Sequence, residues 1–119
     1  MSLQTWNESL MVSTSDSTAL TASTTPTSIL PTAAVYSLPA NFFYVGRKLR
    51  IRAQGRISNV VTTPGTLTLA VLLGAVTAAS GGAMALNIVA KTNVPWFLEW
   101  DLTCRSVGSG TSCTLMHQG

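Results

Sequence analysis

The chain reads RKLRIRAQGRI from residue 47 to residue 57. Five of the seven Lys and Arg residues of the protein fall in this stretch, and they are Arg47, Lys48, Arg50, Arg52 and Arg56. After Lys48 the basic and polar side chains alternate with apolar ones, and a period of two is that of a β-strand with two different faces. The stretch therefore predicts a strand with one apolar and one cationic face, and it indicates an all-β fold.

Charge is scarce in the rest of the chain. Only 9% of the 119 residues are charged, against about 25% in ordinary soluble domains, and 30 positions are Ser or Thr. A polar but uncharged surface is typical of a protein that packs against neighbours. It fits a free cytosolic enzyme less well, because net charge keeps monomers apart.

The length is that of one domain, and two parts of it differ in composition. Residues 1–28 are rich in Ser and Thr without a sustained period, which predicts an extended arm or flexible segment, because hydroxyl side chains compete with backbone hydrogen bonding. Residues 29–119 carry short apolar stretches between Gly and Pro, which predicts an antiparallel β-sandwich. The Thr-Pro-Gly turn at residues 63–65 predicts a hairpin of strands 48–61 and 67–73.

The stretch from residue 67 to residue 90 has no charge and is long enough to span a bilayer. Its first part nevertheless alternates large apolar side chains with smaller ones, as a strand does, and the pair Gly81-Gly82 interrupts it. We therefore expect a buried strand pair with a turn at these glycines and a further strand over residues 84–89, rather than a membrane helix.

The clearest strand runs from Trp96 to Val107. One face carries large apolar side chains and a cysteine, namely Trp96, Leu98, Trp100, Leu102 and Cys104. The other face carries Phe97, Glu99, Asp101, Thr103 and Arg105. We expect the two tryptophans to lie in the core rather than to form an exposed aromatic platform.

The two cysteines lie on either side of a predicted two-residue turn, Gly108-Ser109. That turn would place Cys104 opposite Cys113, close enough for a disulfide. Free thiols are favoured, because the N-terminus lacks the basic start and apolar run of a secretory signal. His117 would share their face, opposite Trp100, but the spacing matches no zinc pattern, so no metal is expected.

No catalytic or cofactor-binding residue is expected. The side chains of Glu99 and Asp101 project from one strand face, as paired acid/base carboxylates do, but a solvent or interface face that pairs with nearby basic residues explains them better. The sequence has no nucleophile elbow, phosphate loop or dinucleotide fingerprint.

The cationic stripe, which comprises Arg47, Lys48, Arg50, Arg52 and Arg56, admits three interpretations. Nucleic-acid binding is the least favoured, because the residues between the charges are aliphatic or Gly rather than stacking aromatics. A solvated outer face and a protein interface remain, and we favour the interface, so these five residues are the candidate contact surface.

Three phrases of the sequence occur in a specific order: SLPANFFYVGRKLRIRAQGRISNVVTTPGTLTLAVLLG, GGAMALNIVAKTNVPWFLEWDLTCRSVGSG and LMHQG. In this order they resemble a group of small structural proteins encoded by tailed bacteriophages, over residues 38–119. The resemblance implies a jelly-roll-like β-sandwich that has no enzymatic activity. It further implies a homotrimer in the virion, assembled in the host cytoplasm.

The resemblance further implies a capsid decoration or cement protein, or a surface spike, that binds other virion proteins, above all the major capsid protein. No nucleic acid, membrane or cofactor is expected as a partner. The alternative is a carbohydrate- or receptor-binding tail module. Relatives of this kind continue past the LMHQG phrase, so the β-domain is expected to be incomplete at its C-terminus: the chain is a piece, a partner supplies the missing strands, or it is a shortened relative.

Overall fold

The computed structural model describes residues 7–109 and 113–119, and the chain divides into two compact units, Met1–Phe42 and Phe43–Gly119. The described part of the first unit contains no strand, and its one regular element is the short 3-10 helix η1, Thr32–Ala34. Its hydroxyl groups bond to nearby backbone, as where Ser23 Oγ donates to the Thr25 carbonyl at 2.8 Å. The β-structure therefore begins in the second unit, later than the predicted domain start at residue 29.

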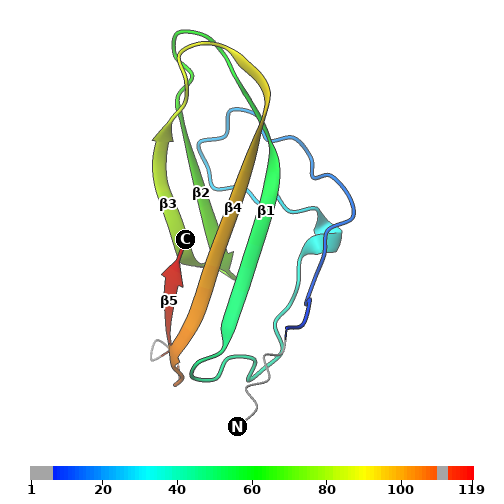
Figure 1. Ribbon diagram of the computed structural model, residues 1–119, viewed down its shortest axis with the longest axis vertical. Coiled ribbons are helices and arrows are strands. Elements are labelled where there is room, and N and C mark those ends of the chain that lie inside the picture. The colour runs from blue at the N-terminus through cyan, green and yellow to red at the C-terminus, as the bar shows by residue number, and fades with distance from the viewer. Residues whose placement is uncertain (1–6, 110–112) are drawn as a thin grey trace. The chain divides into compact units, whose positions relative to one another are not determined.

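The second unit is built from antiparallel strands. These are β1 (Lys48–Asn59), β2 (Thr66–Leu73), β3 (Val76–Ala85), β4 (Lys91–Ser106) and β5 (Thr114–Gln118). One sheet has the order β1-β4-β5 and the other consists of β2 and β3. Figure 1 shows the second sheet lying behind the first. The prediction of an all-β fold is confirmed for the part of the chain that the structure describes.

The alternation read from the sequence sets which side chains enter the core. Along β1 exposed and half-buried residues alternate from Lys48 to Asn59. All the basic residues are on the exposed side, and Asn59 is the one polar residue on the half-buried side. Along β4 the predicted inner face holds, because Trp100 is 7%, Leu102 0% and Cys104 2% exposed. The tryptophan strand and the cationic strand thus turn their apolar faces to the same side.

The core lies between the two sheets. Ala79, Trp100 and Leu102 form its buried centre. The half-buried residues packed around them come from four strands and are Leu49, Ile51, Val71, Leu73, Ala78 and Leu98. A Cβ atom placed on Gly81 of β3 would lie 3.8 Å from Cζ2 of Trp100. The indole of β4 therefore reaches the opposite sheet and joins the two layers.

The predicted hairpin of β1 with β2 is wrong. β1 pairs with β4 instead, from Lys48 opposite Thr103 to Asn59 opposite Lys91. The pair β2–β3 is nested inside the pair β1–β4, and the Thr-Pro-Gly residues 63–65 lie in a connection between the two sheets. The outer face of β1 is cationic and finds carboxylates on β4, whereas β2 offers none. The charges of the two strands therefore match in the register of the pairing that occurs.

The predicted turn at Gly81-Gly82 is also wrong, because β3 continues through it. The tight turn falls at Gly74-Ala75, between β2 and β3, and Gly at the first position of a two-residue loop fits a type II′ hairpin. Thr68 lies opposite Ala83 but Ala70 opposite Ser80, so the two glycines form a β-bulge across from a single residue. A glycine pair interrupted the sequence pattern without ending the strand.

The two connections between the sheets are bonded to each other. The Thr62 amide donates to the Ile88 carbonyl at 3.2 Å, and the Leu86 amide donates to the Gly65 carbonyl at 3.1 Å. The side-chain amide of Asn59 adds bonds to the carbonyls of Asn87 and Val89. These bonds fix the point at which the β1–β4 ladder passes into the β2–β3 pair.

Gly55 of β1 is required by its partner across the ladder. It lies opposite Trp96, and a Cβ atom placed on it would be only 2.8 Å from Cε2 and Cζ2 of that indole. Real Cβ atoms do not approach a ring so closely, so any other residue would displace Trp96. The missing side chain of Gly55 thus leaves the space in which the indole of Trp96 packs on the inner face.

We expect Gly55→Ala to destabilise the second unit by about 1–3 kcal/mol, the usual cost of overpacking a well-filled site. Urea unfolding followed by tryptophan fluorescence measures this loss. Combining Gly55→Ala with Trp96→Leu removes the clashing ring, so the two effects should be strongly non-additive. If the losses of stability from the two substitutions simply add, the cost of Gly55→Ala does not come from a clash with the indole of Trp96.

Candidate protein interface

The outer face of the three-stranded sheet carries most of the charge of the second unit. β1 contributes Lys48, Arg50, Arg52 and Arg56, which are all exposed. β4 contributes Glu99 and Asp101, which lie directly opposite Arg52 and Arg50. The predicted cationic stripe therefore exists as a surface, and the strand beside it supplies carboxylates at the same spacing.

Two of the four cations are neutralised within the chain. Arg50 donates from Nε to Asp101 Oδ1 at 2.8 Å and from Nη2 to Oδ2 at 3.1 Å, which is a bidentate pair. Arg52 Nε lies 2.7 Å from Glu99 Oε2, and Arg50 Nε lies 3.8 Å from Glu99 Oε1. The four side chains form one ladder of alternating charge across β1 and β4.

The carboxylates of Glu99 and Asp101 form ion pairs within the sheet, as expected from the basic residues nearby. Glu99 and Asp101 do project from one face, as predicted, but each has an arginine directly opposite. The hydrogen bond from Arg50 lowers the pKa of Asp101 below its ordinary value, and the charges of Arg50, Lys48 and Arg52 act in the same direction against partial desolvation. Reciprocally, the pair with Asp101 raises the pKa of Arg50. Both groups therefore stay ionised at neutral pH.

Arg47 belongs to a different environment from the rest of the stripe. Its amide donates to the Tyr44 carbonyl at 2.9 Å, closing a turn, and its guanidinium lies 5.1 Å from the centre of the Tyr44 ring. The distance is that of a cation–π contact. The fifth predicted interface residue is thus set at the entrance of β1, beside an exposed aromatic ring.

The other end of the face presents an aromatic side chain that the sequence prediction did not include. Phe97 lies opposite Gln54 on β1 and is 64% exposed. Its neighbour on the same face is Arg56, which lies opposite Pro95 and makes no ion pair with any described residue. The signal was present in the sequence as an apolar residue among polar ones on the outer face of the tryptophan strand.

The predicted register of the cysteines is wrong. Cys104 lies opposite Leu115, and β4 and β5 are separated by residues 107–113 rather than by a two-residue turn. A register shift between Cys104 and Ser106 moves the ladder further. Both cysteines are free thiols, Cys104 buried and Cys113 exposed, and the Cys113 sulfur bonds with the Gly108 backbone.

The same register moves His117 away from the position predicted for it. It lies opposite Leu102 rather than Trp100, and its side chain belongs to an exposed residue of β5. Within residues 7–109 and 113–119, no group of three His, Cys, Asp or Glu side chains is arranged to hold a metal ion.

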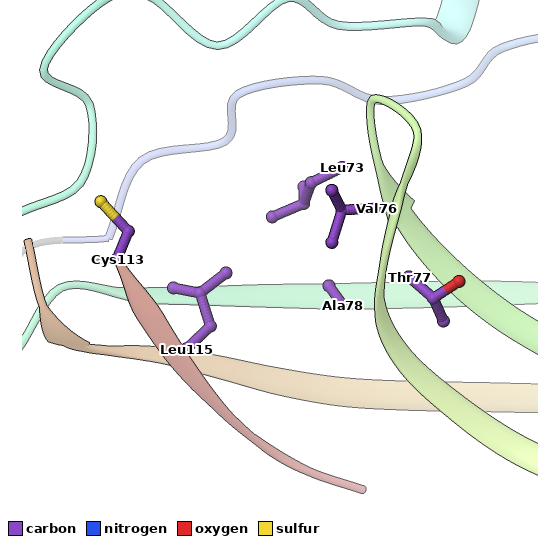
Figure 2. A pocket seen from close by; sticks show the side chains of 6 residues that line it. All are labelled: Leu73, Val76, Thr77, Ala78, Cys113 and Leu115. Carbon is purple, nitrogen blue, oxygen red and sulfur yellow. The ribbon is translucent and has the colours of Figure 1, made fainter. Parts of the chain in front are cut away.

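A small hollow opens between the β2–β3 turn and β5. It measures about 180 Å³, and its lining residues are Leu73, Val76, Thr77, Ala78, Cys113 and Leu115. Figure 2 shows aliphatic side chains from both segments around it. The lining offers one hydroxyl and one thiol but no carboxylate, imidazole or cation, so it supplies packing surface rather than a set of reacting groups.

The stretch predicted as a buried strand pair, residues 67–90, contains most of β2 and all of β3 and no helix. The strand predicted over residues 84–89 is wrong, because β3 ends at Ala85, and most of β3 is exposed rather than buried. Among the described residues, no helix has the length and apolar character needed to cross a membrane. Comparison with protein-family models, with curated proteins and with solved structures finds no match for the chain.

Acid should weaken the fold through the Arg50–Asp101 pair. Since the pKa of Asp101 is lower in the folded than in the unfolded chain, the pair stabilises the fold above the unfolded value and loses its effect as pH falls through the folded value. We expect Asp101→Asn to reduce the fall in urea midpoint as the pH drops below about 4, the ordinary value of an aspartate.

Asp16→Asn, an acid-to-amide change in the first unit, is the matched control and should leave that part of the pH profile unchanged. Equal profiles for the wild-type chain and Asp101→Asn would contradict the role given to this ion pair.

Proposed function

We propose that the chain is a non-enzymatic structural protein of a tailed-bacteriophage virion, a capsid decoration or surface spike protein that attaches to other virion proteins. The observation that carries this proposal is the outer face of the β1-β4-β5 sheet, where cations and an exposed phenylalanine stand on an otherwise weakly charged protein. The major capsid protein is the partner we favour. A homotrimer located in the virion is the assembly that the sequence resemblance implies.

The fold supports this proposal. The nested pairing of β2–β3 inside β1–β4 is the kind of strand arrangement from which jelly-roll sandwiches are built. The scarcity of charge outside one face fits a protein that stays packed in an assembly. In its described part, the arm predicted over residues 1–28 is rich in Ser and Thr and contains no helix or strand, so it suits a segment that orders on assembly.

The contact would be adhesive rather than chemical. Since Arg50 and Arg52 already pair with carboxylates, the attraction for an acidic partner comes from Lys48 and Arg56, which form no ion pair with a described residue. Phe97 supplies the apolar anchor beside Arg56, and Phe and Arg are enriched in the centres of interfaces. The proposed binding surface is therefore centred on the Arg56 end of the stripe rather than on its middle.

The alternative, a carbohydrate- or receptor-binding tail module, needs an exposed aromatic platform. Trp100 is 7% exposed and Trp96 is half-buried against Gly55, both on the inner face of β4. Neither indole is presented as a sugar-stacking surface, so the structural role is better supported.

The test is attachment to particles. We expect the double variant Phe97→Ser with Arg56→Glu to fold normally by circular dichroism but to reduce co-sedimentation with purified phage particles by about tenfold or more, because an anchor is lost and a like charge faces the acidic partner. Cryo-EM of wild-type particles shows where the protein is attached.

A matched control is the exchange Arg50→Asp with Asp101→Arg, which keeps the net charge and the cross-strand ion pair. It should co-sediment as the wild type does. Normal attachment of the Phe97/Arg56 variant, or absence of the wild-type protein from particles, contradicts the proposal.

A further inference from the structure

We propose that two copies of this chain pair through the open edge of β2, forming a continuous four-stranded sheet in the order β3-β2-β2-β3. The β2 edge is a surface different from the cationic face, and this pairing does not rest on the proposed function. The two sheets differ in width, because the β2–β3 sheet has two strands whereas the opposite sheet has three.

The edge of β2 that faces away from β3 is unpaired. Every backbone ladder contact of β2 is with β3, and no described residue elsewhere forms a hydrogen bond with residues 66–73. The strand is eight residues long, and its exposed and half-buried residues alternate without interruption. Such a row of free amide and carbonyl groups is a template for another strand.

Each of the other edges has a feature that discourages pairing, and β2 has none. The outer face of β1 carries four cations, the β3 ladder has two register shifts, one of them the glycine bulge, and β5 has five residues. Charges, bulges and short length are the devices by which proteins protect sheet edges. The sequence of β2, TLTLAVLL, has no charge, no Gly and no Pro.

The chemistry of β2 favours a second copy as the occupant. Antiparallel self-pairing about Ala70 places Leu67 of one copy opposite Leu73 of the other, and Leu69 opposite Val71. Inner-face residues then meet inner-face residues and outer meet outer, because the sum of paired positions is even. No like charges oppose each other, whereas β1 paired with itself would bring arginines together.

This arrangement also limits its own growth. A two-fold pairing consumes both β2 edges, and the strands left at the ends of the new sheet are the bulged β3 strands. The pairing therefore stops at two copies.

The experiment places charges on the two-fold axis. Ala70 is exposed on the outer face, so Ala70→Lys and Ala70→Glu should each fold normally, as circular dichroism checks. Sedimentation equilibrium of the full-length chain should show a concentration-dependent association that each variant weakens by about tenfold or more, because like charges meet at the interface. An equimolar mixture of the two variants should restore it, because Lys then faces Glu.

Ser80→Lys is the matched control, since Ser80 lies opposite Ala70 on the same face of the sheet but on β3. It should associate as the wild type does. A wild-type chain that stays monomeric at millimolar concentration overturns the proposal. So does a mixture of Lys and Glu variants that fails to associate, an outcome that would point to another partner on β2.

Discussion

The ladder between β1 and β4 is the constraint on which the rest of the second unit depends. It joins the two longest strands over their full common length, turns both apolar faces to the same side and leaves β2 and β3 to close over them. Exposed ion pairs contribute little to stability, so the Arg–Asp and Arg–Glu pairs act mainly on register. A shift by one residue would turn the cations toward the core and the aliphatic side chains outward.

Local features of this fold could be predicted from sequence, and distant ones could not. Alternation gave the faces of β1, β2 and β4, since side-chain direction in a strand is a property of neighbouring residues. The partner of β1 depends on residues more than thirty positions away, and the Thr-Pro-Gly turn favoured the wrong neighbour. Glu99 and Asp101 carried the missing information, because their spacing matches that of Arg50 and Arg52.

The candidate interface shows the same division. The five basic residues were identified as a surface from their spacing alone, but the net charge of that surface depends on the carboxylates of β4. Phe97 was placed on the outer face by the same alternation, and its importance depends on the exposure that the fold gives it. Bulges at Gly81-Gly82 and near Cys104 shifted two registers, because a bulge depends on the opposing strand as well as on its own sequence.

The nesting of one strand pair inside the other has a kinetic consequence. The β2–β3 turn spans two residues, whereas the β1–β4 contacts join positions separated by 32 residues, from Asn59 to Lys91, up to 55 residues, from Lys48 to Thr103. The inner hairpin can form within microseconds, but the outer ladder must wait for a long loop to close. The second unit has the high contact order of a slow-folding β-protein, and its order of assembly runs from the middle of the chain outward.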